Sequence, residues 1–332
     1  MPSSTQPQHV RPPGLRPSDT VGIIAPAGPV DPDALEAGCA TLLRLGYRPF
    51  YLPSILDRDL YFAGSMERRL NEFHEMFRRR EVRAIVCARG GYGCNYLLPH
   101  LDLGLVRRNP KILVGCSDVT LLLTYLCDAA GLVTFHGPMA AGDFSRPGGV
   151  DEEAWFAAVA SGEGYERTFD AAEVEPLAKG TAEGLLYGGC LSLLCASLGT
   201  PYEIRTRDTI LFLEDLNEPP YRIDRMLMQL KLAGKLKGVK GIIFGEMRRC
   251  EQRGAEDYTL QQVAMRVLGD LHVPIAFGLK SGHVSNKNFT LPLGVRATLH
   301  VSEGVTLRYE PAVRRRRMQT VRRRTWLQST CI

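Results

Sequence analysis

Three reactive side chains stand where short apolar runs of the sequence end. They are Ser117, Glu214 and His283, which offer a hydroxyl, a carboxylate and an imidazole. Open α/β sheets place their binding crevice at the carboxyl ends of parallel strands, so residues that follow such strands can meet there. A nucleophile, an orienting acid and a general base require these types of group. Each also has an ordinary structural explanation, namely a helix cap, a helix-start acid and a packed or solvated loop residue.

The serine lies in the segment Gly115-Cys116-Ser117-Asp118, between a strand-like and a helix-like apolar run. A serine in such a position sits on a sharp turn, and the free N–H groups of the following helix can stabilise an oxyanion. The segment departs from the G-x-S-x-G elbow because Val119 stands where the second glycine would be. Cys116, the last residue of the strand, is expected to point into the core, on the opposite side from Ser117.

The segments around Ser117 alternate between strand and helix patterns. Apolar runs of strand length recur, and between them apolar residues follow helical spacing behind capping residues such as Asp31 and Ser65. The expected strands are 20–25, 82–88 and 111–116, and the expected helices are 33–45, one from 66 onward, and 119–127. This alternation predicts an α/β fold with a doubly wound parallel sheet of the flavodoxin or Rossmann type.

The pattern changes after Phe144–Gly149, where an acidic, alanine-rich connection begins. Beyond it the sequence predicts a smaller, β-rich α/β domain that ends in a hairpin turning at Pro292–Gly294. We therefore divide the chain into a disordered extension at 1–18, a first domain at 19–150, a linker at 151–178, a second domain at 179–310 and a disordered arginine-rich tail at 311–332. Ser117 then belongs to the first domain, and Glu214 and His283 belong to the second.

The positive charge of the chain is concentrated at its C-terminal end. The 332 residues carry a formal net charge of +5, but residues 311–332 hold seven arginines and no lysine or acid. Residues 1–310 therefore carry a net charge of −2. Nucleic-acid binding would depend on the tail alone, so we expect no nucleic-acid partner.

The sequence predicts a cytoplasmic protein with no membrane partner. Residues 1–20 contain five prolines and no apolar run, unlike a signal peptide. No uninterrupted apolar stretch reaches the roughly 18 residues that a membrane span needs. The nine cysteines form no C-x-x-C pair, and several lie inside apolar runs, as reduced and buried thiols do. We expect no metal site, because no Cys/His pair with ligand spacing has a second such pair nearby.

Several motifs resemble the LD-carboxypeptidase family of serine peptidases, which also contains the microcin-immunity peptidases. The matching segments follow the family's order from residue 20 to about residue 308. The most specific are ARGGYG at 88–93, GCSD at 115–118, FHGPM at 135–139, LEDLNEPPYRIDRMLMQL at 213–230 and GLKSGH at 278–283. One position departs from the family pattern, since Tyr96 stands where arginine is usual.

The resemblance implies a role for each candidate residue. Ser117 is the nucleophile, His283 the general base and Glu214 the acid that orients it. The backbone N–H groups of Gly91 and Asp118 form the oxyanion hole, and Tyr92 and His136 are candidate substrate contacts. The implied activity releases terminal D-Ala from murein tetrapeptides during peptidoglycan recycling. The resemblance further implies a homodimer that needs no metal or other cofactor.

Two alternative functions stay open at this stage. A microcin-immunity-type peptidase would cleave a peptide–nucleotide conjugate and would need an aromatic platform for the base, for which Trp155 is a candidate. A non-catalytic nucleotide-binding module would use the glycines of RGGYG. The second alternative lacks G-x-G-x-x-G and a P-loop lysine, which are the usual phosphate-binding signatures.

Overall fold

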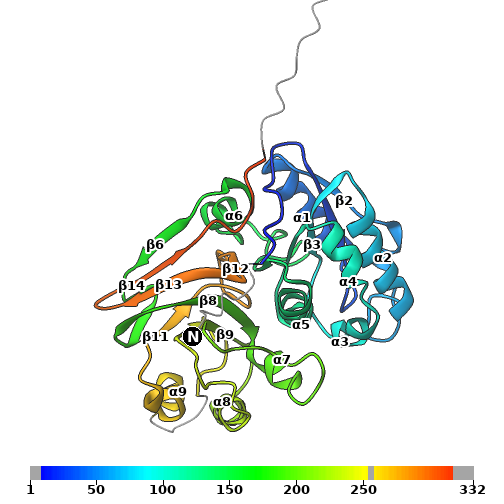
Figure 1. Cartoon of the computed structure of the whole chain (residues 1–332). Coiled ribbons are helices and arrows are strands. Elements are labelled where there is room, and N and C mark those ends of the chain that lie inside the picture. The colour runs from blue at the N-terminus through cyan, green and yellow to red at the C-terminus, as the bar shows by residue number, and fades with distance from the viewer. Residues whose placement is uncertain (1–8, 253–257, 317–332) are drawn as a thin grey trace, which may run out of the picture.

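Two β-sheets form the core of this computed structural model, which describes residues 9–252 and 258–316 (Figure 1). The first sheet has six strands in the order β12-β5-β4-β3-β1-β2. They are β1 (Thr20–Ile24), β2 (Arg48–Phe50), β3 (Val82–Cys87), β4 (Ile112–Gly115), β5 (Thr134–His136) and β12 (Leu291–Leu293). Strands β1 to β5 pair in parallel, in the order β2-β1-β3-β4-β5 of a flavodoxin-like doubly wound fold. The predicted parallel sheet is confirmed.

Helices cover both faces of this sheet, because successive residues of a strand point to opposite sides. Val86 of β3 packs in the same cluster as Leu35 of α1, whereas Ile85 packs in the cluster that contains Phe73 of α2. We call the chain before the boundary near residue 150 the first half and the chain after it the second half. The helices of the first half are α1 (Pro32–Arg44), α2 (Met66–Arg78), α3 (Cys94–Leu97), α4 (Leu103–Arg108) and α5 (Thr120–Tyr125). Short helical turns are η1 (Pro53–Leu56), η2 (Leu98–His100), η3 (Ser117–Val119) and η4 (Leu126–Ala130).

The second sheet has eight strands in the order β6-β14-β13-β8-β9-β10-β11-β7. They are β6 (Tyr165–Phe169), β7 (Glu175–Ala178), β8 (Gly180–Cys190), β9 (Thr209–Glu214), β10 (Gly241–Gly245), β11 (Ile275–Leu279), β13 (Val295–Val301) and β14 (Val305–Tyr309). The central strands β8 to β11 are parallel, and antiparallel strands flank them.

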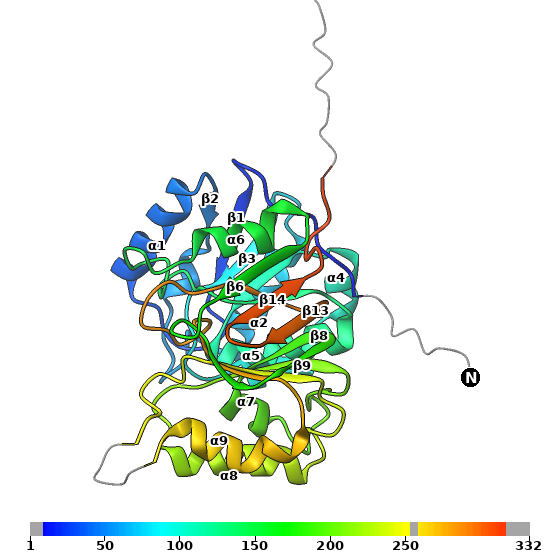
Figure 2. The ribbon, with the colours of Figure 1, turned by 90° about the vertical axis from the view of Figure 1, so that its left-hand side faces the viewer.

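Helices also pack on the second sheet. They are α7 (Leu191–Ala196), α8 (Pro220–Leu232) and α9 (Leu260–Leu268), followed by the turn η6 (Gly269–Leu271). Figure 2 shows α8 and α9 lying alongside each other at the base of the molecule, and apolar residues of both share one core cluster with β9 and β10. Among the described residues, none of the helices combines the length and apolar character needed to cross a membrane.

The chain crosses from one sheet to the other at Gly294. β12 pairs with β5 in the first sheet, whereas β13 pairs with β8 in the second. Gly294 has a φ of +85°, a conformation that glycine adopts readily, and this residue redirects the chain between them. The predicted hairpin turn at Pro292–Gly294 is wrong, because the hairpin is formed by β13 and β14 around Ser302–Gly304. The alternation of apolar and polar residues gives no sign that Leu291–Leu293 pair with β5 in the first sheet and not with the strand that follows them.

Segments expected to lie outside the two domains contribute to them. The expected linker supplies α6 (Glu152–Phe156), η5 (Ala157–Ser161) and the two edge strands β6 and β7. Pro13 forms a bridge with Arg314, and the apolar residues Leu15 and Val313 are buried. The expected disorder therefore does not hold for residues 9–18 and 311–316, because these segments dock on each other and on the core. Residues 1–8 and 317–332 lie outside the described residues.

Candidate active site

Ser117 lies just beyond the carboxyl end of β4, where the chain turns into η3. Its φ is +60°, a left-handed conformation that is uncommon outside glycine, so the serine occupies a strained turn. Gly90, in the loop after β3, provides the space for this turn. A Cβ on Gly90 would lie 2.6 Å from Ser117 Cβ and 2.7 Å from its Oγ. The neighbouring Cys116 is buried, as predicted, and burial raises the pKa of its thiol well above the ordinary value.

The loop after β3 is held against the start of η3. Asp118 Oδ2 accepts the backbone N–H of Cys94 at 2.7 Å, and the Gly28 N–H donates to Gly90 O at 3.0 Å. Gly91 has a φ of +117°, and its N–H forms no hydrogen bond with any residue that the structure describes. The first N–H groups of a helical turn such as η3 also have no partner within the turn. The backbone around Ser117 thus offers free donors of the kind that stabilise an oxyanion.

The buried Glu214 and the partly exposed His283 form a hydrogen-bonded pair. Glu214 ends β9 and is 1% exposed. Its Oε2 accepts the His283 backbone N–H at 3.0 Å and faces His283 Nδ1 at 2.8 Å. An ionised carboxylate can only accept, so the proton of a neutral imidazole lies on Nδ1 and Nε2 keeps a free lone pair. The pair therefore has the arrangement of an orienting acid and a general base.

The charges of this pair shift the pKa of each partner. Burial by itself raises the pKa of Glu214, but the contacts with His283 and His136 outweigh burial and hold that pKa well below its usual range. Burial by itself lowers the pKa of His283, yet the charge and hydrogen bond of Glu214 raise it to about 8. Glu214 is consequently an anion at neutral pH, and His283 titrates just above neutrality.

His136 lies behind the pair and not in the substrate space. Its side chain is completely buried, its Nδ1 is 3.1 Å from Ser281 Oγ, and its Nε2 is 3.6 Å from Glu214 Oε1. This burial does not fit the expected substrate contact, because no substrate atom can reach the ring. His136 instead faces the second oxygen of Glu214, a role that the FHGPM motif alone could not indicate.

A contact between the two halves ties the strand beside Glu214 to the start of the helix after Ser117. Thr120, three residues after Ser117, accepts the Cys190 N–H at 3.1 Å, and Cys190 is paired with Glu214 across β8 and β9. In the described residues no hydrogen bond joins Ser117 to His283 directly. Catalytic hydrogen bonds often form only when substrate is bound, so the absence of this bond is compatible with a triad.

An aromatic cluster borders the glycine loop. Tyr92, which follows Gly91, is 43% exposed, and its ring stacks 5.9 Å from that of Phe62. Tyr61 and Tyr96 complete the cluster with ring centroids 6.0 and 6.1 Å from Tyr92, and both are exposed. Sequence reasoning identified Tyr92 but missed Tyr61 and Phe62, which approach from a distant loop. Tyr96, the departure from the family pattern, adds a ring where a charge is usual.

One group of donor atoms invites comparison with a metal site. Atoms of Cys190, Glu214 and His283 lie within 4.8 Å of one another. However, Glu214 Oε2 is already engaged by His283, and burial raises the pKa of the Cys190 thiol well above its ordinary value. A neutral thiol and an occupied carboxylate are poor metal ligands. The residues present therefore fit an acid–base pair better than a metal centre.

Comparisons with known proteins cover most of the chain. The LD-carboxypeptidase N-terminal domain matches residues 21–137, and the LD-carboxypeptidase C-terminal domain matches residues 183–299. A probable murein peptide carboxypeptidase of Bacillus subtilis is 38% identical over 301 residues, which is 89% of this chain and 93% of that protein.

Solved structures show the same arrangement of elements. A muramoyltetrapeptide carboxypeptidase from Oxalobacter formigenes has a TM-score of 0.78 and is 30% identical, covering 88% of this chain and 98% of that one. The microcin C7 self-immunity protein MccF has a TM-score of 0.85 at 24% identity, covering 92% of this chain and 99% of that one. The likeness to MccF, at that identity, shows a shared fold.

Proposed function

The chain belongs to the LD-carboxypeptidase family, and from this premise we propose that it is a serine carboxypeptidase acting on murein tetrapeptides. It hydrolyses the L,D peptide bond that precedes the terminal D-Ala, in peptidoglycan recycling. The observation that carries the proposal is the hydrogen-bonded pair of Glu214 and His283, joined at 2.8 Å, with the strand beside Glu214 tied by Cys190 to Thr120 at the start of the helix after Ser117.

In the acylation step, Ser117 Oγ bonds to the carbonyl carbon of the third peptide residue. His283 Nε2 takes the hydroxyl proton, and Glu214 stabilises the resulting imidazolium through Nδ1. The carbonyl oxygen becomes an oxyanion that accepts hydrogen bonds from the Gly91 and Asp118 N–H groups, each contributing about 3 kcal/mol. The peptide C–N bond then breaks, and His283 gives its proton to the departing amine of D-Ala.

In the deacylation step, water replaces D-Ala in the same site. His283 Nε2 removes a proton from the water, whose oxygen bonds to the acyl carbon and forms a second oxyanion in the same hole. The ester bond to Ser117 breaks, and His283 returns the proton to Oγ. The products are the tripeptide and free D-Ala, and the enzyme ends in its starting state.

The aromatic cluster supports a peptide-binding role for the space beside Ser117. Tyr92 adjoins Gly91 of the proposed oxyanion hole, and Tyr61 and Tyr96 extend the exposed rings outward. Tyrosines give large contact area at low conformational cost and keep a polar tip in water. We assign Tyr92 as a substrate contact on this basis.

Replacement of the nucleophile tests the proposal. We expect Ser117→Ala to reduce release of D-Ala from murein tetrapeptide by at least about 10³-fold, because the covalent step is lost. Release is followed by mass spectrometry, and Ser302→Ala, in the distant β13–β14 turn, is the matched control. Unchanged release in Ser117→Ala, or no release by the unmodified protein, would contradict the proposal.

The microcin-immunity alternative has less support at the level of the site. The expected aromatic platform, Trp155, is 1% exposed and packs edge-on against Phe144 at 5.1 Å. A ring buried in this way cannot stack on a nucleobase. Direct comparison of kcat/KM for a murein tetrapeptide and for a peptidyl-sulfamoyl nucleotide separates the two activities, and a higher value for the nucleotide conjugate would reverse the ranking.

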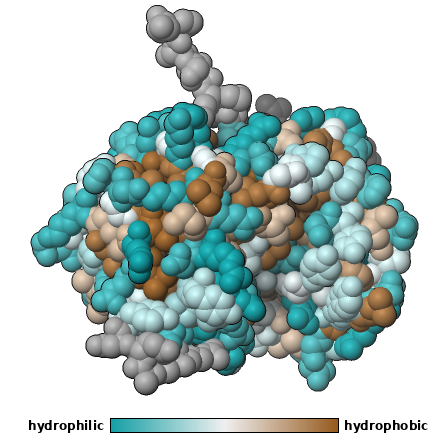
Figure 3. Space-filling model, turned by 90° about the horizontal axis from the view of Figure 1, so that it is seen from below, coloured by the Kyte–Doolittle hydropathy of each residue, from teal (hydrophilic) through white to brown (hydrophobic). Residues whose placement is uncertain are grey.

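We also propose a cytoplasmic homodimer that binds no nucleic acid. Support for a second copy comes from α8, which exposes Tyr221, Met228 and Leu232. Seen from the side on which α8 lies, the surface carries apolar patches among polar side chains (Figure 3). The net charge of −2 on residues 1–310 does not favour nucleic acid. Sedimentation velocity at micromolar concentration measures the oligomeric state, and a monomer would contradict this part.

A further inference from the structure

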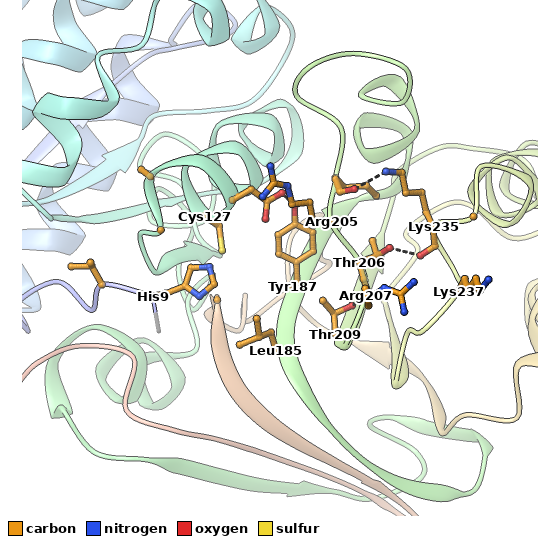
Figure 4. A pocket seen from close by; sticks show the side chains of 17 residues that line it. His9, Cys127, Leu185, Tyr187, Arg205, Thr206, Arg207, Thr209, Lys235 and Lys237 are labelled. Atoms are coloured by element: carbon orange, nitrogen blue, oxygen red, sulfur yellow. Dashed lines mark hydrogen bonds between the residues drawn. The ribbon is translucent and has the colours of Figure 1, made fainter. Parts of the chain in front are cut away.

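A cavity, whose lining side chains are shown in Figure 4, lies at the end of β9 opposite the catalytic acid. Its volume is about 700 Å³. β9 starts at Thr209 in the cavity wall and ends at Glu214, a span of roughly 17 Å at about 3.3 Å per residue. His9 and Cys127 line it from the first half of the chain, and Tyr187 lines it from the second. This cavity is therefore distinct from the triad and is built by both halves.

Positive charge is concentrated in this cavity. Its walls carry one acid, Asp128, and four cationic side chains, which are Arg205, Arg207, Lys235 and Lys237. Residues 1–310 as a whole have a net charge of −2, so the cavity is opposite in sign to the body around it. A concave surface lined by one sign of charge raises the local concentration of ions of the other sign.

Two of these cations have no acidic partner in the part of the chain that the structure describes. Lys235 pairs with Glu203 at 2.9 Å, and the charge of Arg205 acts on Asp128. Arg207 and Lys237, in contrast, pair with no carboxylate in the described ranges. The Arg207 side chain packs on Gly238, the residue after Lys237, so Arg207 lies against the segment that carries Lys237. Both cations line the cavity, and a bound anion would supply the opposite charge that each lacks.

One wall of the cavity is partly apolar and is held in place by a hydrogen bond between the two halves. Tyr187 is buried and its hydroxyl donates to Asp128 Oδ2 at 2.7 Å, which joins the two halves of the chain. Leu185 lies on the same strand beside it. A cavity of this size, with an apolar wall and a few charged groups, matches the dimensions of a small-molecule site.

We propose that this cavity binds a small organic ligand through a diphosphate group held by Arg207 and Lys237. A guanidinium contacts two oxygens of one phosphate at once, and an ammonium acts as a point charge for the next. The remaining volume beside Tyr187 accommodates the organic part. Because the ligand contacts both halves, its binding stabilises their docking and raises the melting temperature of the whole protein.

Inorganic pyrophosphate is the probe for the charged part of the ligand. Calorimetric titration of the full chain is expected to give saturable binding, and the double variant Arg207→Gln/Lys237→Gln is expected to bind at least about 10-fold more weakly. Lys179→Gln is the matched control, because Lys179 is an exposed cation paired with Glu303 on another surface. Succinate, a dianion without phosphate, is expected to bind at least about 10-fold more weakly than pyrophosphate.

Each outcome bears on the assignment. The assignment is overturned if the unmodified protein shows no saturable binding of pyrophosphate. It is also overturned if the double variant binds equally well, because that variant keeps all arginines of residues 311–332 and lacks only the two cations of the cavity. Succinate binding as tight as that of pyrophosphate would overturn the phosphate assignment. A rise in melting temperature with pyrophosphate that Lys179→Gln retains and the double variant loses would support it. D-Ala release by the double variant, measured without added anion, checks that the triad is still assembled.

Discussion

The two oxygens of Glu214 have different neighbours, and each oxygen faces a histidine ring. Oε2 faces Nδ1 of His283 at 2.8 Å, and Oε1 faces Nε2 of His136 at 3.6 Å. Glu214→Gln keeps the shape but can place an amide donor against Nδ1, which favours the wrong imidazole tautomer. We expect kcat for D-Ala release to fall by roughly 10²- to 10⁴-fold, with KM little changed.

The neighbouring acid supplies the comparison for this variant. Asp215 is also buried, but its oxygens accept the backbone N–H groups of Ser192 and Leu216. Asp215→Asn is therefore expected to reduce stability while kcat stays within a few-fold of the unmodified value. If Glu214→Gln and Asp215→Asn lose kcat equally, Glu214 has no special role in orienting the base.

The pH dependence of activity reports the state of His283. A general base must be neutral, and the pKa of His283 is raised to about 8, chiefly because Glu214 outweighs the opposing effect of burial. We expect kcat/KM to rise with pH through about 8 and to level off above about 9, because protons leave the imidazole over this range. In Glu214→Gln the midpoint should move to lower pH. A midpoint near 5 in the unmodified protein would contradict this assignment.

Residue types and strand ends were enough to suggest the triad, but not its surroundings. Ser117, Glu214 and His283 each stand at or after the end of a predicted apolar run, and the structure confirms a strand at all three places, namely β4, β9 and β11. The partner of Glu214 Oε1 was not predictable, because His136 reaches it only through the pairing of β4 with β5 and the docking of the two halves. Contacts that depend on tertiary docking leave no local pattern in the sequence.

At the scale of elements, the turn before His283 determines how closely the pair packs. Gly282 has a φ of +90°, and a Cβ there would lie 2.6 Å from Glu214 Cδ and 2.7 Å from His136 Cε1. Gly282→Ala must therefore displace the acid as well as strain the backbone. We expect D-Ala release to fall by at least about 10²-fold, since a displacement of about 1 Å can cost that much.

A second glycine separates backbone strain from steric clash. Gly199 also has a positive φ, +75°, but a Cβ there has no atom within 4 Å. Gly199→Ala is expected to lose about 1–2 kcal/mol in the free energy of unfolding and to keep its activity. Urea denaturation measures the first quantity and the D-Ala assay the second. Full activity in Gly282→Ala would show that the loop tolerates displacement.

Elements with strong local signals were predicted within one or two residues, and edge strands were not. Asp31 and Ser65 cap α1 and α2 as expected, and β3 and β4 match their apolar runs. β6 and β7 fell within the expected linker because each exposes much of its surface and lacks an apolar run. Only the neighbouring strands of the sheet define them as strands.

At the scale of the whole molecule, the two halves share one structure. β12 belongs by sequence to the second half but pairs with β5 of the first, and one apolar cluster contains Val114, Trp155 and Leu299 from three different segments. We expect residues 1–150 alone not to fold, because the edge of β5 and part of this core would be exposed. Circular dichroism during heating should show no cooperative transition for this fragment.

The complete chain is the control for this prediction. It should unfold in one calorimetric transition, with the van't Hoff and calorimetric enthalpies equal, because the shared core couples the halves. Cooperative unfolding of the isolated fragment, or two separate transitions in the complete chain, would contradict a single folding unit. The predicted boundary near residue 150 divides the sequence, and this experiment measures whether it also separates two units of stability.

The position of β12 also matters while the chain is being synthesised. A ribosome adds residues in order, so β5 emerges early but its partner at Leu291–Leu293 follows more than a hundred residues later. During that interval one edge of the first sheet has no strand to pair with, and unpaired edges attract other chains. Translation speed and chaperone supply should therefore influence the yield of active protein.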